Sequence, residues 1–510
     1  MSNTVKKPNV IFLMTDQQRW DCIGRFNSYI KTPNLDKLAA DGIIFNQAVC
    51  QCPMCVPSRN SMMFGMYASQ IGVRTNAGGI FDETRLPSRP LPQLMKDAGY
   101  FTAGFGKTHW NNGAFTDKPS KRGFDVRAEG QSKNSSCYEY GATMMDDEGQ
   151  DPEGLKAYFE ETKNWGGGEE NYLGYTGCTS TLPKEHHRDG FIFTKCMEFL
   201  DGPIPEDQPL FLYLSFIKPH AGFNVPPEYE SQYRLEDIPD LELPPWEEEP
   251  DTHVRAVSKV SEALRTRHEE IKAHWKTLTS EQRRRTTLRY WANCTFLDDF
   301  IGKAVEKMRQ RGLLDNALIL FVSDHGDMMG ERDFRFSKYC LFDSSVRVPM
   351  ILSGNLIPQE KKGTVDERPA ELVDLIPTIC DVVGIDVDPR LPGISLLSDR
   401  VRPGAFSEFH GGGPEVPQPA PAWMWRNKDY KLILFREGTV LDDTPLKGEL
   451  YDLKKDPHEW YNQYDNSEYL PVKLRMMEQL LCHIATVYAK GPAFGDLKGD
   501  LKIRPQGKKD

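Results

Sequence analysis

The sequence has no hydrophobic run long enough to cross a membrane. Its first apolar run, residues 10–14, is short, and no later stretch approaches the roughly twenty apolar residues that a membrane helix needs. The first run is also too short for the core of a signal peptide. A basic excess is missing as well, because the formal net charge is −11. These absences predict a cytoplasmic protein that binds neither a membrane nor nucleic acid.

The cysteine pattern of a disulfide-stabilised or zinc-binding protein is missing too. The 11 cysteines are an odd number spread over 510 residues, which favours reduced thiols. Cys50, Cys52 and Cys55 lie close together, but no second Cys/His pair stands nearby at the spacing of a zinc site. Each cysteine is therefore expected to be a small buried apolar residue unless its neighbours indicate a reaction.

Short apolar runs alternate with helical patterns through the first two thirds of the chain. The alternation predicts an α/β fold with a large, mostly parallel sheet sandwiched by helices. Two stretches, at about 130–185 and 225–255, are rich in loop-forming residues and are expected to be irregular or extended. The predicted strands are 10–14, 100–104, 209–217 and 317–322, and the predicted helices are 32–42, 91–98 and 286–311.

A proline-rich stretch at residues 403–421 marks a boundary. Beyond it, residues 429–435 and 448–452 have strand patterns, and residues 468–488 have a helical pattern. We therefore expect a large α/β domain over residues 1–400, which would carry any site at the strand ends. A smaller α+β subdomain with an antiparallel sheet and a terminal helix would occupy residues 401–510.

Polar side chains follow several predicted strands. Asp16 and Gln17 come directly after the first strand, and Asp324 and His325 follow the strand at 317–322. In open parallel sheets, ligands bind at the carboxyl ends of the strands, so these two pairs of donors could meet at one cation. Taken alone, each pair is only weak evidence for a metal site, because acidic residues also cap many helices.

Cations and histidines occupy similar positions. Lys107 and His109 follow one strand, Lys218 and His220 follow another, and Lys338 and Arg347 lie further along the chain. A single lysine or histidine is normally solvated or packed in a core. Repeated placement beyond strand ends suits a tetrahedral oxyanion ester held between a metal and positive side chains.

The pentapeptide Cys55-Val-Pro57-Ser-Arg59, followed by a helical stretch that ends at Gly65, resembles the signature of type I sulfatases of the alkaline phosphatase superfamily. Within this family the sequence resembles arylsulfatases and is also close to phosphonate monoester hydrolases. The resemblance covers most of the chain. Further segments that resemble the family are residues 9–17, 32–45, 106–109, 218–220, 323–327 and 449–459.

The resemblance implies that Cys55 is oxidised to formylglycine by a formylglycine-generating enzyme, which recognises Pro57 and Arg59. The aldehyde hydrate offers two hydroxyls on one carbon, so that one hydroxyl attacks sulfur. The other, once deprotonated, expels sulfate by C–O cleavage. The substrate would be a small anionic ester.

The resemblance also implies roles for individual residues. One divalent cation would be bound by Asp16, Gln17, Asp324, His325 and the modified Cys55. The catalytic residues would be Cys55, Arg59, Lys107 and His109, with His109 helping to deprotonate the hydrate. The residues that hold the ester oxygens would be His220 and Lys338.

Gln17 and His325 depart from the family pattern, in which many members have a carboxylate and an asparagine. Ca²⁺ is favoured by the oxygen donors, while the amide and imidazole leave Mn²⁺ as an alternative. The same pair resembles phosphonate monoester hydrolases and phosphodiesterases, so a phosphonate monoester or phosphodiester is the alternative substrate. The leaving group is not specified by any pattern, and a homo-oligomer is compatible with the sequence.

Overall fold

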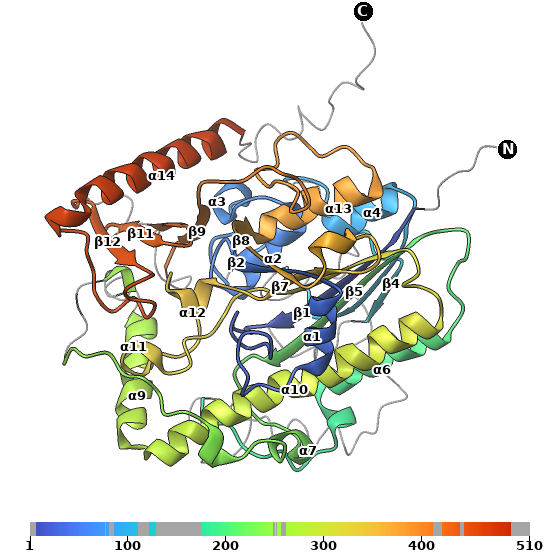
Figure 1. Cartoon of the computed structure of the whole chain (residues 1–510), viewed down its shortest axis with the longest axis horizontal. Helices are drawn as coiled ribbons and strands as arrows, with labels where there is room; N and C mark the ends of the chain where they lie inside the picture. Colours follow the sequence, from blue (N-terminus) through green and yellow to red (C-terminus); the bar gives the residue numbers. More distant parts are fainter. Residues whose placement is uncertain are drawn as a thin grey trace, which may run out of the picture.

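The computed structural model describes residues 7–490 except 77, 81–85, 111–121, 129–174, 248–249, 251, 255, 257–261, 412–420 and 439–442. Most of the loop expected at 130–185 therefore lies outside the described residues. Two sheets and their covering helices make up the described part (Figure 1).

The larger sheet has eight strands, β1 (Asn9–Asp16), β2 (Gly42–Val49), β3 (Phe101–Gly106), β4 (Val126–Ala128), β5 (Leu210–Pro219), β6 (Ala317–Ser323), β7 (Met350–Ser353) and β8 (Thr364–Glu371). Their order is β4-β3-β5-β1-β6-β7-β2-β8. Only β7 runs antiparallel to its neighbours, β6 and β2. The predicted mostly parallel sheet is confirmed.

Helices cover both faces of this sheet. One face is covered by α1 (Pro33–Ala40), α6 (Arg188–Asp201) and α10 (Ser280–Gln310), and the other by α2 (Cys55–Phe64), α4 (Leu91–Asp97) and α13 (Leu375–Val383) (Figure 1). Side chains alternate between the faces of a strand. Accordingly, Ile11 and Leu13 of β1 join the core under α10, whereas Val10 and Phe12 join the core under α2. Both faces are buried, which explains why the strands are almost continuously apolar.

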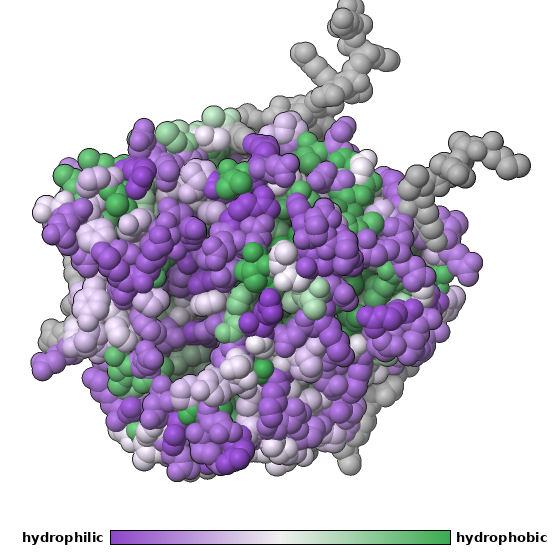
Figure 2. All heavy atoms as spheres, in the orientation of Figure 1, coloured by the Kyte–Doolittle hydropathy of each residue, from purple (hydrophilic) through white to green (hydrophobic). Residues whose placement is uncertain are grey.

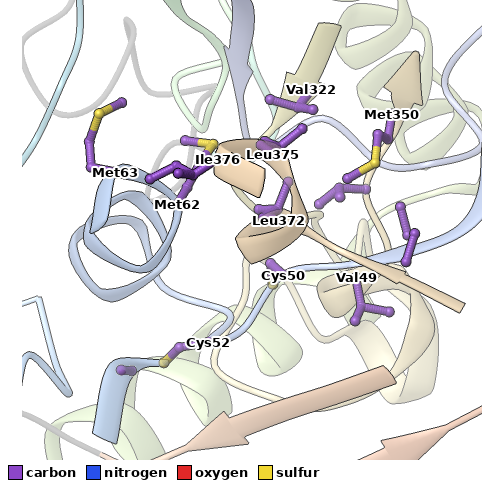
Figure 3. Close-up of a cluster of buried hydrophobic side chains, with 14 of the residues drawn as sticks. Val49, Cys50, Cys52, Met62, Met63, Val322, Met350, Leu372, Leu375 and Ile376 are labelled. Carbon is purple, nitrogen blue, oxygen red and sulfur yellow. The ribbon is translucent and has the colours of Figure 1, made fainter. Parts of the chain in front are cut away.

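The core on the α2 side anchors the helix that begins at Cys55. Figure 3 shows Met62 of α2 beside Ile376 of α13, with Val322 of β6 nearby. All ten residues of α2 are buried. The position of residue 55 is therefore set by packing along the whole helix.

Further helical elements are short, apart from α9, which has 16 residues. They are α3 (Ala68–Ile71), α7 (Pro227–Glu230), α9 (Glu262–Thr277), α11 (Glu331–Phe334), α12 (Asp343–Val346), and the 3-10 turns η3 (Lys184–His186), η4 (Leu235–Asp237), η5 (Gln359–Lys361), η6 (Leu372–Asp374) and η7 (Ser467–Tyr469). Two of them, α7 and η4, interrupt the segment expected to be extended, because a proline at the first helical position preorganises the turn at α7. The helix expected at 286–311 starts earlier, at Ser280, because Thr279 and Gln282 form a capping box.

The smaller sheet contains β9 (Ala405–Phe409), β10 (Ala422–Arg426), β11 (Tyr430–Phe435) and β12 (Lys447–Asp452). All of its strand pairs are antiparallel, as predicted. Helix α14 (Leu470–Lys490) lies across this sheet, at the upper left of Figure 1, and buries Met476 and Leu480 against it. The division of the chain at residues 400 and 401 stays a prediction.

Within the described ranges, no helix is both long and apolar enough to span a bilayer. The face of the molecule in Figure 2 is mostly hydrophilic and is interrupted by separate apolar patches.

The ten described cysteines are free thiols, in agreement with the expected reduced state.

Candidate active site

Cys55 is the first residue of α2 and lies at the carboxyl edge of the large sheet, close to the ends of β1 and β6. The preceding residue, Met54, is extended, and the chain turns into the helix at Cys55. The thiol is almost completely buried, with 2% of the residue exposed. A reactive group at this position is shielded from bulk water.

Four potential metal ligands surround one point. One ligand atom from each of Asp16, Cys55, Asp324 and His325 lies within 4.8 Å of the others, and all four residues are buried. Strands β1 and β6 are parallel neighbours, so Asp16 and Asp324 leave the sheet side by side. The ring of His325 is oriented by contact of Nδ1 with the Gly326 carbonyl at 2.9 Å, which leaves Nε2 3.3 Å from the Cys55 Sγ.

Arg59 joins the two carboxylates. Its Nε donates to Asp324 Oδ2 at 2.7 Å and its Nη2 to Asp16 Oδ2 at 3.0 Å. Its Nη1 donates to the Lys107 carbonyl at 2.6 Å and to Ser215 Oγ at 3.1 Å. Because Arg59 lies one helical turn beyond Cys55 on α2, the same helix places both residues.

Two lysines complete the positive surroundings. Lys107 Nζ lies 2.6 Å from Asp16 Oδ2, and Lys338 Nζ donates to Cys55 Sγ at 2.8 Å. Lys107 follows Gly106, where a Cβ would lie 1.8 Å from the Ser215 carbonyl oxygen, so only glycine fits at this position. Lys338 also donates to Gln17 Oε1 at 2.9 Å.

Two histidines also hydrogen-bond to Cys55, namely His109 and His220. Burial and the charge of Lys107 lower the pKa of His109 to about 4. Burial and the charge of Lys338 also lower the pKa of His220. A neutral imidazole can accept a proton, which is what a general base requires.

The site stabilises negative charge at residue 55. Burial alone would raise the pKa of the Cys55 thiol, but Lys107, Lys338 and His325 together hold this pKa well below its usual value. Burial and the Cys55 charge would likewise raise the pKa of Asp16, but Lys107 and Arg59 lower it. An oxyanion formed at this point would meet the same cations.

All ten residues predicted for the site lie together. The last of these ten to be placed is Gln17. Its Nε2 donates to Asp327 Oδ2, and its backbone N–H donates to Asp324 Oδ1 at 3.0 Å. The bond to Asp327 directs the amide oxygen of Gln17 towards Lys338. Two carboxylates, an amide oxygen and an imidazole make a donor set that suits a hard or borderline divalent cation.

Sequence reasoning assigned no role to Asp327, Tyr213 or Ser215. Asp327 holds Gln17, and the Tyr213 hydroxyl donates to the Lys107 carbonyl at 3.0 Å. Tyr213 and Ser215 could have been singled out from the sequence, because they are polar side chains in the nearly apolar strand β5. Lys218 and Arg347, which the sequence analysis also noted as cations beyond strand ends, bind groups other than residue 55. Lys218 donates to Asn224 Oδ1 at 2.7 Å, and Arg347 pairs with Asp343 at 3.3 Å.

A buried residue with a stabilised anionic form, metal-type donors and converging cations at the strand ends of an α/β sheet are the features of a hydrolase that acts on anionic esters. Residues 8–385 match the family model described as Sulfatase, and residues 330–485 match the model described as N-sulphoglucosamine sulphohydrolase, C-terminal. The chain belongs to the sulfatase family, in the alkaline phosphatase superfamily, and is a sulfatase-type hydrolase.

Known proteins are similar along almost the whole chain. An arylsulfatase of Clostridium perfringens (strain 13 / Type A) is 27% identical over 484 residues, which cover 91% of each protein. An uncharacterized sulfatase of Escherichia coli (strain K12) is 27% identical over 492 residues, covering 94% of this chain and 87% of that protein. The crystal structure of a phosphonate monoester hydrolase of Agrobacterium radiobacter has a TM-score of 0.73 at 22% identity, covering 94% of this chain and 96% of that one. This last likeness shows the shared fold.

Proposed function

We propose that this protein hydrolyses sulfate monoesters through a formylglycine made from Cys55, with one divalent cation beside it. The observation that carries the proposal is the position of Cys55 Sγ, which lies 3.3 Å from His325 Nε2 and 2.8 Å from Lys338 Nζ, in the same cluster as the Asp16 and Asp324 carboxylates. A buried cysteine that only packs in a core behaves as a small apolar residue, whereas a reactive cysteine lies among cationic groups, as Cys55 does.

The cation would be held by Asp16, Gln17, Asp324 and His325, together with residue 55. Two adjacent carboxylates with no exposed surface suit a divalent cation, and oxygen donors favour Ca²⁺, with Mn²⁺ as the alternative. When bound, the cation supplies Lewis acidity to an oxygen at the reaction centre.

The protein's own side chains would handle charge and protons around residue 55. Formylglycine hydrate supplies two hydroxyls on one carbon. His109 is within hydrogen-bonding reach of residue 55 and would take a proton from it, while Lys107 and Arg59 stabilise the resulting negative charge. His220 and Lys338 reach residue 55 from other elements and would hold the ester oxygens.

A formylglycine-generating enzyme is the partner that the proposal requires. Cys55, Pro57 and Arg59 are all buried in the folded chain. We therefore expect the modifying enzyme to act before the chain has folded, when the pentapeptide is accessible.

The substrate class is proposed from the relatives. The similarity to the arylsulfatase of Clostridium perfringens suggests an ester whose leaving group is an aromatic alcohol. Because the cations converge on one buried point, a small anionic ester group fits the site better than an extended polyanion would.

Peptide mapping of residue 55 tests the mechanism. The chain is expressed with and without a formylglycine-generating enzyme, and aryl sulfate hydrolysis is compared with the fraction of aldehyde. Activity should rise in proportion to the aldehyde, and Cys55→Ala should abolish it. Full activity with a quantitatively unmodified thiol would refute the formylglycine mechanism.

A phosphonate monoester or phosphodiester is the alternative substrate. The observation that favours it is the combination of Gln17 and His325 at the metal-binding positions, together with the fold shared with the phosphonate monoester hydrolase. The catalytic efficiency on an aryl sulfate, compared with that on an aryl phenylphosphonate, separates the two. A much higher efficiency on the phosphonate would reverse the order of the two proposals.

A further inference from the structure

The loop that carries Lys338 is tied to the active site on both sides of this residue. The Ser337 N–H donates to Asp327 Oδ1 at 2.8 Å, and the Tyr339 N–H donates to the Pro53 carbonyl at 3.3 Å. Ser337 and Tyr339 have φ angles of 64° and 73°, in the left-handed region that residues other than glycine seldom adopt. Such conformations persist where the surroundings impose them, so contacts elsewhere in the loop help to keep Lys338 in place.

Two side chains from distant parts of the chain hold the same loop at Leu341, three residues beyond Lys338. The Leu341 N–H donates to His253 Nε2 at 2.8 Å, and the Leu341 carbonyl accepts from Lys431 Nζ of β11 at 3.0 Å. Leu341, His253 and Lys431 have no exposed surface. Both backbone polar groups of Leu341 are therefore bound in the protein interior, where an unmade hydrogen bond is costly.

Glu449 of β12 determines which nitrogen of His253 faces Leu341. A backbone N–H can only donate, so Nε2 accepts and the ring proton lies on Nδ1, which donates to Glu449 Oε1 at 2.8 Å. The His253 backbone N–H donates to the same oxygen at 2.5 Å, and the Tyr451 hydroxyl donates to Oε2 at 2.8 Å. Burial would raise the pKa of Glu449, but His253 holds this pKa below its usual value, so the carboxylate stays an acceptor.

The segment 449–459, which begins with Glu449, holds the same loop from its other end as well. Glu459 accepts the Asp343 N–H at 2.7 Å and pairs with Lys431 Nζ at 2.6 Å. Asp343 begins α12, which lies beside the smaller sheet in Figure 1. Both ends of the segment therefore support the stretch of chain that follows Lys338.

We propose that His253, oriented by Glu449, is a positioning residue for Lys338 and holds the loop so that Lys338 reaches residue 55. The inference rests on the proposed sulfate ester hydrolysis, in which Lys338 holds an ester oxygen. Lys338 Nζ donates to Cys55 Sγ at 2.8 Å, and a shift of the loop at Leu341 would lengthen this contact. A misplacement of about 1 Å at a reaction centre can cost on the order of 100-fold in rate.

Amide hydrogen exchange tests this anchor without turnover, metal or formylglycine. Exchange of the peptide that contains Leu341 is followed by mass spectrometry, on the full unmodified chain with a chelator present. Glutamine at position 253 keeps an acceptor near the place of Nε2, whereas the shorter asparagine keeps only a donor towards Glu449. His253→Asn should therefore speed exchange in this peptide about tenfold, and His253→Gln should leave it within about twofold.

A double-mutant cycle tests whether the anchor acts through Lys338. On the chain with formylglycine at position 55, His253→Asn should lower kcat/KM for an aryl sulfate about 10- to 100-fold, and His253→Gln should stay within about threefold of the wild-type chain. In a Lys338→Ala chain, His253→Asn should cost less than about twofold more, because the residue that it positions is gone. A general loss of structure would instead cost the same factor in both backgrounds.

The matched control is a second histidine that packs on the smaller sheet. The ring of His483, on α14, packs against Tyr67, Phe406 and Trp425 rather than against Leu341. His483→Asn should lower the melting temperature, while exchange at Leu341 and kcat/KM stay within about twofold of the wild-type values. Circular dichroism shows that each variant is folded.

The outcomes separate this inference from the proposed function. Unchanged exchange at Leu341 in folded His253→Asn protein would overturn the inference, and so would equal losses of kcat/KM in the two backgrounds. If His253→Asn does not fold, a tenfold or greater loss of kcat/KM in His253→Gln, or rapid exchange at Leu341 in the wild-type chain, would overturn it instead. Failure of the proposed function is seen independently, as absence of hydrolysis of both aryl sulfate and aryl phenylphosphonate by the wild-type chain with formylglycine at position 55.

Discussion

Replacing Arg59 with glutamine should destabilise the protein even when no substrate, metal or modification is present. Arg59 has no exposed surface and bonds to both Asp16 and Asp324. Glutamine is shorter and neutral, so it leaves two buried carboxylates without their shared cation. Lys107 still contacts Asp16 at 2.6 Å, but the 2.7 Å contact of Asp324 with Arg59 Nε is lost.

The size of the effect follows from this burial. Removing one partner of a buried ion pair typically costs about 3–5 kcal/mol, because the other charge is left buried. An unfolding entropy of roughly 2.1 cal/mol/K per residue gives about 1 kcal/mol/K for a chain of this length. The substitution should therefore lower Tm by about 3–5 °C.

The assay is thermal unfolding followed by circular dichroism, on chain with an unmodified thiol and with a chelator present. These conditions remove any effect of Arg59 on formylglycine formation or on metal binding. The matched control is Arg309→Gln, which breaks the exposed pair with Glu306, where the side chains are 58% and 52% exposed. An exposed pair contributes less than about 1 kcal/mol. If Arg59→Gln unfolds within 1 °C of the wild-type chain, Arg59 does not act as the structural counter-ion of the site.

Three further substitutions have expected outcomes. Asp327→Ala should weaken Ca²⁺ binding about 10- to 100-fold in calorimetry, because Asp327 orients Gln17, one of the proposed metal ligands. The exposed Asp386→Asn should leave Ca²⁺ binding unchanged, and an unchanged Kd for Asp327→Ala would refute the role of Asp327. Gly106→Ala should yield little folded protein, because its Cβ would lie 1.8 Å from a backbone oxygen of β5, and Gly99→Ala, at a similar φ with nothing within 4 Å, should fold; equal yields would contradict the steric argument. The pKa of His268 is lowered to about 2, so the unfolded chain binds a proton below pH 6.5 that the folded chain does not. Wild-type stability should therefore fall by about 1.5 kcal/mol more than that of His268→Gln between pH 6.5 and pH 5, and parallel pH profiles would show that this histidine is not buried in its neutral form.

The large sheet was predictable because its strands are buried on both faces and are therefore almost entirely apolar. Helix starts were less predictable. Residues 280–285 of α10 are polar or charged, and only the contact of Thr279 with Gln282 shows that the helix begins there. The short turns α7 and η4 have no apolar periodicity of their own, so the proline-rich composition indicated an extended segment instead.

The candidate site was predictable to the extent that chain position determines it. Donors that follow parallel strands must come to one edge of the sheet, which places Asp16, Asp324 and Lys107 together without knowledge of any loop. The support given by Asp327 could not be predicted, because its partner Gln17 lies 310 residues away in sequence.

The amino-acid sequence by itself determined the candidate nucleophile and its helix, since Cys55, Pro57 and Arg59 are fixed by local spacing. It also determined which residue types stand at the strand ends. Only the tertiary structure decided which cations reach residue 55. Lys338 does so from 283 residues away, while Lys218 and Arg347 bond to other groups. The reason is physical: local spacing sets positions along one helix or strand, whereas contacts between distant loops depend on how the two faces of the sheet are packed.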